Sequence, residues 1–211
     1  AFPEDHPLCL GMMGMHGAGE ANHAVQEADL LLAFGMRFDD RVTGKLNEYA
    51  RNADVIHVEI DPSELDKNVA TTVAINADVY RTLHVMLNDP ELIYKPRRRW
   101  LKEIDDNRKE TAGVEEEIAQ GVGDSGKLLM KTIVRRLSDI TGGRDIIVPD
   151  VGQHQMMAAR FYSYQTENSW FGSGGAGTMG CSLPMAIGVK LARPNERVWS
   201  ISGDGGFQMN M

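Results

Sequence analysis

Residues 198–206 read Val-Trp-Ser-Ile-Ser-Gly-Asp-Gly-Gly, a short run typical of a β-strand that enters a glycine turn directly. The turn places the carboxylate of Asp204 among backbone N–H groups, which can cradle a phosphate. Mg²⁺ is commonly held by one or two carboxylates together with phosphate oxygens. The stretch therefore predicts a strand, a turn and a helix, with a phosphate and metal site at the turn. A tight turn with a solvated Asp204 is an equally good interpretation of these four residues alone.

Working outward, the chain repeats this pattern of strand, loop and helix. Continuous apolar runs at 30–34, 55–60, 72–75 and 145–148 are typical of strands buried on both faces of a parallel sheet. Helix-like stretches accompany them, one opening at 14–17 and others at about 79–87, 128–137 and 182–191. Strands that alternate with helices predict βαβ units and an α/β fold.

A polar, charged stretch interrupts the alternation after Asn88-Asp89-Pro90. We predict a first domain at 1–88, a linker at 89–125 and a second domain at 126–211, both domains incomplete. The linker carries Arg97-Arg98-Arg99, which could contact nucleic acid or could belong to a solvated linker and surface helix. The acidic character of the whole chain favours the second interpretation.

Composition narrows the class of protein. The 211 residues carry a formal net charge of −8 and are 42% hydrophobic, as expected for a globular protein that does not bind nucleic acid. The sequence contains no apolar run long enough to span a membrane and no visible signal peptide. Cys9 and Cys181 lack metal-ligand spacing and are interpreted as reduced thiols of a cytoplasmic protein.

Three further loops carry candidate binding residues. Gly152, Gln153 and His154 follow the strand at 145–148, and a tract of glycines at 172–180 precedes an apolar helix. Gly, Arg and Asp residues at 35–41 follow the strand at 30–34 and suit a nucleotide, although a surface loop of mutually paired charges is the alternative. In an open parallel sheet such loops gather at one edge, where ligands bind. The G-x-G-x-x-G fingerprint follows no strand, so an ordinary dinucleotide site is not supported.

Four stretches resemble a known family: GMHGAGEANHAVQEADLLLAFGMRFDDRVTGKL (14–46), VGQHQMMAARFY (151–162), SGGAGTMGCSLPMAIG (173–188) and ISGDGGFQMN (201–210). Together they are similar to the catalytic large subunit of acetohydroxyacid (acetolactate) synthases, which use thiamine diphosphate. The resemblance implies that the first domain is the later part of a Rossmann-like, FAD-binding middle domain. It implies that the second is the first half of a thiamine-diphosphate-binding domain, so the natural protein should begin earlier and continue further.

The resemblance also implies roles for individual residues. Asp204 matches the Mg²⁺ ligand, Arg41 a contact to the carboxylate of the second substrate, and Met179 the wedge that bends the cofactor into its reactive shape. The thiamine diphosphate contacts would be Gln153, His154, Gly177, Thr178, Met179, Gly203, Asp204, Gly205 and Gly206. The FAD contacts would be Gly14, Met15, His16, Gly35, Met36, Arg37, Phe38, Asp39, Glu59, Ile60 and Asp78.

The implied reaction is decarboxylation of pyruvate and condensation with a second 2-keto acid, pyruvate or 2-oxobutyrate, early in branched-chain amino-acid synthesis. The implied enzyme is a transferase, a homodimer or tetramer with a regulatory small subunit, in the cytoplasm or, with a transit peptide, in a plastid. The residues 1–211 alone are expected to be inactive. The alternatives are another FAD-containing thiamine enzyme, such as pyruvate oxidase or glyoxylate carboligase, and a non-catalytic binding module.

Overall fold

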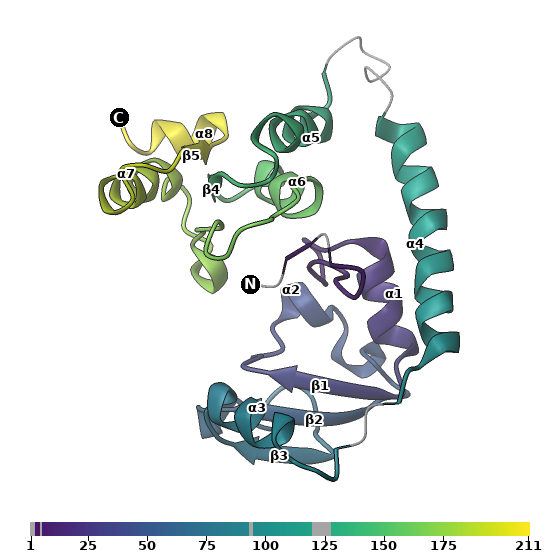
Figure 1. Ribbon diagram of the computed structural model, residues 1–211. Coiled ribbons are helices and arrows are strands. Elements are labelled where there is room, and N and C mark those ends of the chain that lie inside the picture. The colour runs from purple at the N-terminus through teal and green to yellow at the C-terminus, as the bar shows by residue number, and fades with distance from the viewer. Residues whose placement is uncertain (1–2, 5, 93–94, 120–127) are drawn as a thin grey trace. The chain divides into compact units, whose positions relative to one another are not determined.

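The computed structural model describes residues 3–4, 6–92, 95–119 and 128–211, and its contacts divide the chain into two units. The N-terminal unit comprises Met13–Met15 and Gly19–Ala112, and the C-terminal unit comprises residues 1–12, 16–18 and 113–211. Both are α/β structures with parallel sheets, as the sequence predicts (Figure 1). The predicted boundary between the linker and the second domain, at 125–126, lies outside the described residues.

The N-terminal unit is built on a three-stranded sheet in the order β1-β2-β3, formed by β1 (Leu30–Phe34), β2 (Asp54–Glu59) and β3 (Val73–Asn76). All pairs are parallel, with Ala33 beside His57 and Val58 beside Ile75. The three predicted strands are thus confirmed to within a residue or two. Their carboxyl ends meet at one edge, followed by Gly35, Ile60 and Ala77 (Figure 1).

Helices α1 (Gly19–Glu27), α2 (Asp40–Thr43), α3 (Val79–Leu87) and α4 (Arg98–Ala119) accompany this sheet, with single 3₁₀ turns at Leu46–Glu48 and Pro62–Glu64. Helix α4 is the surface helix expected after the arginine run. The helix predicted to open at Gly14 begins only at Gly19. Gly14 instead exchanges two backbone hydrogen bonds with the Asn22 side chain, at 2.6 and 3.1 Å, and has a positive φ of 84°.

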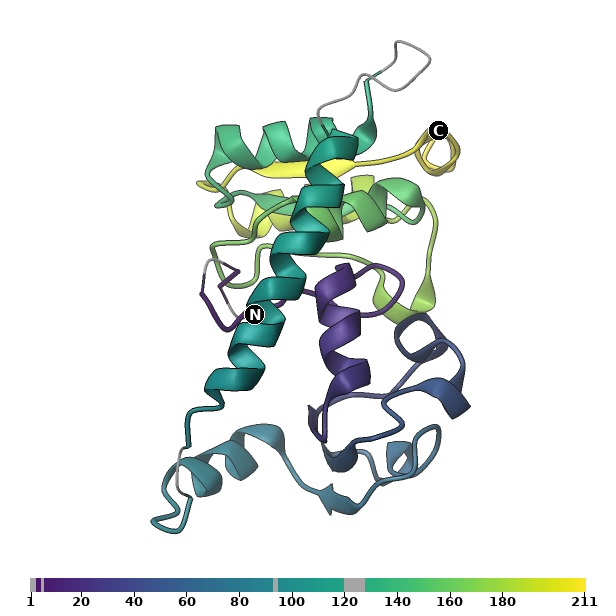
Figure 2. The ribbon, with the colours of Figure 1, turned by 90° about the vertical axis from the view of Figure 1, so that its right-hand side faces the viewer.

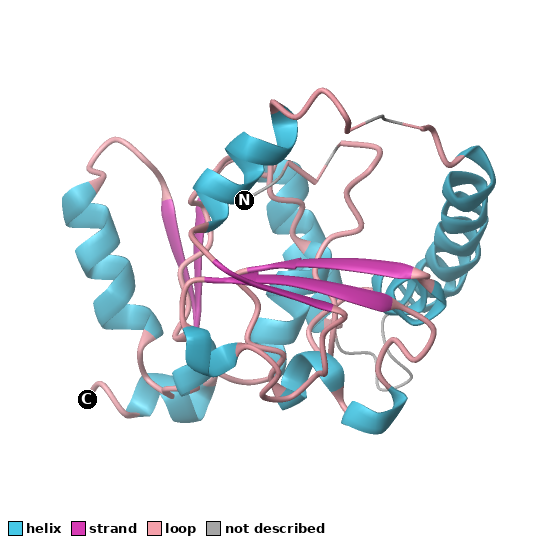
Figure 3. Cartoon of the chain, turned by 90° about the horizontal axis from the view of Figure 1, so that it is seen from below, coloured by secondary structure: helices cyan, strands magenta, loops and turns pink. Residues whose placement is uncertain are grey.

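The C-terminal unit pairs β4 (Ile146–Pro149) with β5 (Val198–Ile201) in parallel, Val148 beside Ser200. Its helices are α5 (Met130–Thr141), α6 (Gln153–Phe161), α7 (Ser182–Ala192) and α8 (Asp204–Gln208), with a 3₁₀ turn at Gly174–Ala176. Figure 2 shows these helices layered around the strands, and Figure 3 shows the strands of both units in magenta. The strand and helix order again follows the sequence prediction.

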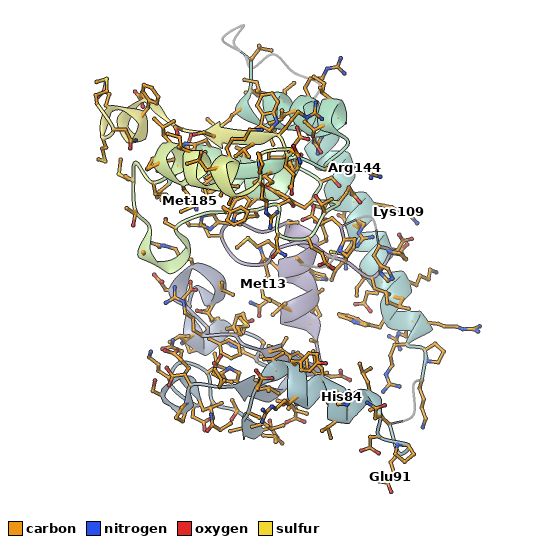
Figure 4. All side chains as sticks on the ribbon, turned by 60° about the vertical axis from the view of Figure 1, so that its left-hand side comes forward. Met13, His84, Glu91, Lys109, Arg144 and Met185 are labelled. Atoms are coloured by element: carbon orange, nitrogen blue, oxygen red, sulfur yellow. The ribbon has the colours of Figure 1, made fainter. Side chains whose placement is uncertain are left out.

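Strand β4 is buried on both faces, which explains its unbroken apolar sequence. Ile147 packs with Val134, Ala158 and Tyr162 from α5, α6 and the segment after it. Ile146 and Val148 point the other way and pack with Ala186 of α7. Met185, labelled in Figure 4, lies against this second cluster. The rigid centre of the unit thus fixes where the loop after β4 begins.

Residues near the start of the chain pack on the C-terminal unit. The Glu4 N–H donates to the Tyr164 carbonyl at 3.2 Å, and the Tyr164 N–H donates to the Glu4 carboxylate at 2.9 Å. Burial raises the pKa of Glu4, although the hydrogen bond from Tyr164 opposes that shift. Within the described ranges, no helix is long and apolar enough to cross a membrane.

Candidate functional site

Three loops of the C-terminal unit meet where β4 and β5 end. A Cβ atom placed on Gly203 would lie 3.2 Å from the His154 ring, and one on Gly205 would lie 3.9 Å from the Met179 methyl group. A Cβ on Gly206 would lie 2.5 Å from the Asp150 carboxylate. The structure therefore brings together residues from 150–154, 179–180 and 203–206, which are far apart in the sequence. This is the edge at which parallel sheets bind ligands.

His154 lies at the first turn of α6 and is buried. Burial lowers its pKa, while the charge of Asp150 and a hydrogen bond to the Asp150 backbone oppose the shift. The ring is therefore neutral near pH 7. Its Nε2 atom is buried and has no hydrogen-bond partner among the residues that the structure describes. A buried ring nitrogen without a partner is unusual, so this atom is available to a ligand.

Asp204 opens α8 with an exposed side chain. Its carboxylate accepts a hydrogen bond from the Gly205 N–H at 2.8 Å, which leaves oxygen lone pairs free for a cation. The described part of the chain contains no group of three or more His, Cys, Asp or Glu side chains that could hold a metal. A magnesium ion at Asp204 would therefore need oxygens from elsewhere, and a bound diphosphate would supply them.

The glycine-rich loop presents an apolar side chain to the turn that carries Asp204, since a Cβ on Gly205 would lie 3.9 Å from the Met179 methyl group. The Thr178 N–H donates to the Ser173 hydroxyl at 3.0 Å, which closes the loop, and Gly177 has a left-handed φ of 59°. Met179 follows and is 46% exposed although it is large and apolar. Gln153 is exposed at the start of α6. An exposed methionine next to a carboxylate and turn amides fits a ligand with an apolar ring at one end and an anion–metal pair at the other.

In the N-terminal unit, the candidate FAD residues lie along the edge formed by the carboxyl ends of the strands. Gly35 and Met36 follow β1, and Glu59 and Ile60 stand at the end of β2. Gly14 and Met15 join this region, because the Met15 N–H donates to the Arg41 carbonyl at 2.7 Å. His16, half-buried in the turn before α1, belongs to the C-terminal unit.

The charged candidates of the N-terminal unit are engaged with near neighbours. Arg37 pairs with Asp39 at 3.1 Å, and Arg41 pairs with Asp40 at 3.6 Å. Such pairs are what a surface loop of mutually paired charges at 35–41 predicts. Neither pair excludes a ligand, because both arginines are more than half exposed.

Other candidates of this unit have local structural roles. Glu59 accepts the Ile60 and Asp61 N–H groups at 2.8 and 3.1 Å. Asp78 caps α3 by accepting the Arg81 N–H at 2.9 Å. Phe38 is 2% exposed and packs edge-on against the rings of Tyr49 and His57. Its carbonyl accepts a hydrogen bond from the Asn68 side chain at 3.0 Å, so little of Phe38 is open to a ligand.

Sequence reasoning passed over one residue at the centre of the C-terminal site. Asp150 is fully buried, and its carboxylate accepts the Gly180 N–H at 2.9 and 3.0 Å and the Val151 N–H at 2.7 Å. No local signal marks Asp150 as Gly203 and Gly205 mark Asp204, because Val151 separates it from Gly152 and its partner Gly180 lies 30 residues away in the sequence.

Comparison with protein-family models places both units in one family. Residues 1–86 match the central domain of thiamine pyrophosphate enzymes, and residues 150–211 match their C-terminal TPP binding domain. The second match includes residues 150–154, 179–180 and 203–206, which meet where β4 and β5 end. It supports thiamine diphosphate as a ligand of this domain.

Relatives with curated names are similar along the whole chain. Acetolactate synthase of Mycobacterium leprae is 44% identical over 99% of the chain, which covers 33% of that protein. Acetolactate synthase 1, chloroplastic, of Oryza sativa subsp. japonica is 41% identical over 100% of the chain and 32% of its own length. The probable acetolactate synthase large subunit of Methanocaldococcus jannaschii is 42% identical, with 99% and 36% covered. The chain thus spans about a third of the length of these relatives.

Proposed function

Because this chain belongs to the thiamine pyrophosphate enzymes, we propose that it is part of the catalytic large subunit of an acetolactate synthase. The observation that carries the proposal is identity of 40–44% along the whole chain to proteins of that name from bacteria, a plant and an archaeon. The reaction would join pyruvate, with loss of CO₂, to a second 2-keto acid. Thiamine diphosphate, when bound, supplies the electron sink for the decarboxylation.

The geometry of the C-terminal unit supports the assignment of the cofactor-binding residues. Asp204 would hold Mg²⁺ against the diphosphate, and Gly203, Gly205, Gly206, Gln153 and His154 would surround the anionic end. Gly177, Thr178 and Met179 would face the ring end, with Met179 as the apolar wedge. The free lone pairs of Asp204 are the feature that best fits this arrangement.

FAD is proposed for the edge of the N-terminal sheet, where Gly14, Met15, Gly35, Met36, Arg37, Asp39, Glu59 and Ile60 lie. His16, Phe38 and Asp78 also belong to the proposed FAD set. Arg41 would bind the carboxylate of the second keto acid, since its guanidinium is exposed and pairs with Asp40 at 3.6 Å. The term "large subunit" in the names of two relatives supports an oligomer with a regulatory small subunit. A cytoplasmic or plastid location remains a proposal, consistent with the chloroplastic relative.

The test is acetolactate formation by the full-length protein in the presence of thiamine diphosphate, Mg²⁺ and FAD, with pyruvate as substrate. Acetolactate is the expected product. Peroxide release from pyruvate would instead indicate a pyruvate oxidase, and carboligation confined to glyoxylate would indicate a glyoxylate carboligase. Residues 1–211 alone, assayed in parallel, should show no carboligase activity.

A further inference from the structure

Asp150 contacts several parts of the C-terminal site at once. Its backbone N–H donates to the Ile201 carbonyl at 2.8 Å, which ties the end of β4 to the end of β5. Its carboxylate, 0% exposed, holds the N–H of Gly180 through both oxygens and the N–H of Val151 through one. One side chain thus fixes the glycine-rich loop against the start of α6.

The same carboxylate sets how closely α8 approaches. Gly206 is buried, and a Cβ atom there would lie 2.5 Å from Asp150 Oδ2 and 2.9 Å from its Cγ. No side chain fits, so the α8 backbone rests directly on the carboxylate. On the far side, a Cβ at Gly180 would lie 3.0 Å from Met209 and 3.4 Å from the Gly206 carbonyl. Asp150, Gly180 and Gly206 therefore form one three-way contact, and Asp204 stands two residues from it.

We propose that Asp150 is the positioning residue of the diphosphate and metal site. It holds the β4 loop, the glycine-rich loop and the first turn of α8 in register, so that His154, Met179 and Asp204 face one ligand. The inference rests on the proposed function, because it assigns Asp150 to that same site. Partners that orient a metal ligand without touching the metal commonly change affinity by about 10–100-fold when they are removed.

The direction of the change in diphosphate affinity distinguishes a positioning role of Asp150 from a purely electrostatic one. A buried carboxylate repels a nearby anion, so neutralising it would strengthen diphosphate binding if charge were its whole contribution. Asp150→Asn should do the opposite. An amide group has only one oxygen, so it cannot accept with both atoms at Gly180, and its N–H groups would face Gly206.

The C-terminal unit offers a matched control. Asp145 is 5% exposed at the opposite end of β4, where its carboxylate binds Arg197 at 3.0 Å and the Trp199 indole N–H at 2.8 Å. Asp145→Asn also breaks a buried carboxylate contact, but it does so away from the three loops. Loss of general stability should appear in both variants, whereas loss of cofactor affinity should appear only in Asp150→Asn.

The experiment is calorimetric titration of thiamine diphosphate into the full-length protein at saturating Mg²⁺. For Asp150→Asn we expect the dissociation constant to rise by about 10–100-fold, with turnover largely recovered at saturating cofactor. For Asp145→Asn it should stay close to the wild-type value. Unchanged or tighter binding by Asp150→Asn, or equal losses in both variants, would overturn the proposal.

A second variant keeps the test decisive if Asp150→Asn does not fold. Gly206→Ala disturbs the same contact from the α8 side, keeps the Asp150 carboxylate and should weaken binding similarly. Where both single variants fold, the double variant should be no weaker than either single one. Independent, additive losses would contradict a shared contact. A wild-type protein that binds thiamine diphosphate without forming acetolactate would refute the proposed function and leave this inference standing. A wild-type protein that does not bind it would overturn both.

Discussion

The two sheet edges differ in how their polar groups are engaged. In the N-terminal unit, Arg37, Arg41, Glu59 and Asp78 all have a partner within a few residues along the chain. In the C-terminal unit, Asp204 binds only its neighbouring Gly205 N–H among the described contacts, and His154 Nε2 has no described partner. The first edge must therefore exchange existing contacts for a ligand, whereas the second already presents free groups. Substitutions should consequently cost more binding at the second edge than at the first.

The largest effect is expected at Asp204. In the full-length protein, Asp204→Ala should weaken Mg²⁺-dependent binding of thiamine diphosphate by about a hundredfold or more, beyond the loss typical of an outer partner. Because the carboxylate is exposed and accepts its hydrogen bond from within its own turn, thermal stability without cofactor should change little. Calorimetry across a Mg²⁺ series and a melting curve measure the two effects.

Asp139, exposed on α5, supplies the control, since Asp139→Ala removes a surface carboxylate far along the chain from the three loops. If Asp204→Ala kept full affinity at limiting Mg²⁺, Asp204 would be a turn residue, and the difference between the two edges would lose its main support.

A smaller effect is expected at Arg41, which tests whether a paired arginine can still serve a substrate. The guanidinium fork matches a carboxylate through two parallel hydrogen bonds, which an ammonium cannot reproduce. Arg41→Lys should therefore reduce use of the second keto acid by about 10–100-fold, the equivalent of roughly 1.5–3 kcal/mol for a charge-assisted pair. Decarboxylation of the first pyruvate should largely survive, so side products should rise relative to acetolactate.

Asp40→Asn is the informative companion, because it removes the partner at 3.6 Å and keeps Arg41. If Arg41 serves the acceptor, Asp40→Asn should leave product partitioning unchanged. Equal damage to partitioning by both variants would assign the effect to the salt bridge instead. Products are quantified with pyruvate and 2-oxobutyrate supplied together.

Arg37 should show a weaker effect again, because binding a flavin requires it to share or leave Asp39. Arg37→Ala is expected to lower FAD affinity by about three- to tenfold, since part of the gain from a charge-assisted bond is offset by the lost ion pair. Flavin retained after gel filtration, read from its absorbance, measures this. Arg81→Ala, on the exposed face of α3, should retain wild-type flavin, and equal retention by both variants would contradict the assignment.

The sequence predicted features that depend on neighbouring residues and missed features that depend on residues far apart along the chain. The run at 30–34 matches β1 residue for residue, because a continuous apolar run is a local signature of a strand. The expected burial on both faces is wrong for this strand, since Leu30 and Leu32 are exposed. The start of α1 was predicted too early, because Gly14 is held by the Asn22 side chain rather than by helical hydrogen bonds. Asp204 could be found because a glycine turn surrounds it in the sequence. Asp150 could not, since its partner Gly180 is 30 residues away and nothing local indicates burial.

The smallest expected effect is the pH dependence contributed by His154. Burial lowers its pKa in the folded protein, so the unfolded chain takes up the proton first as the pH falls. Stability linked to this ring is therefore fully present above its unfolded pKa and is lost as the pH falls through that value. A ring that stayed unprotonated when folded would contribute at most about 0.8 kcal/mol between pH 8 and pH 6, and solvent screening brings the effect below that limit.

His154→Gln, which keeps polarity without titrating, should show a smaller drop in urea midpoint over this range than the wild type. Tryptophan fluorescence suits the measurement, because Trp170 and Trp199 lie in the same unit. His84→Gln, on exposed helix α3, should behave as the wild type. An identical pH dependence in wild type and His154→Gln would mean that the ring is protonated as readily in the folded chain as in the unfolded chain. The Nε2 atom would then not be a free acceptor, and the contrast between the two sheet edges would lose the support of His154.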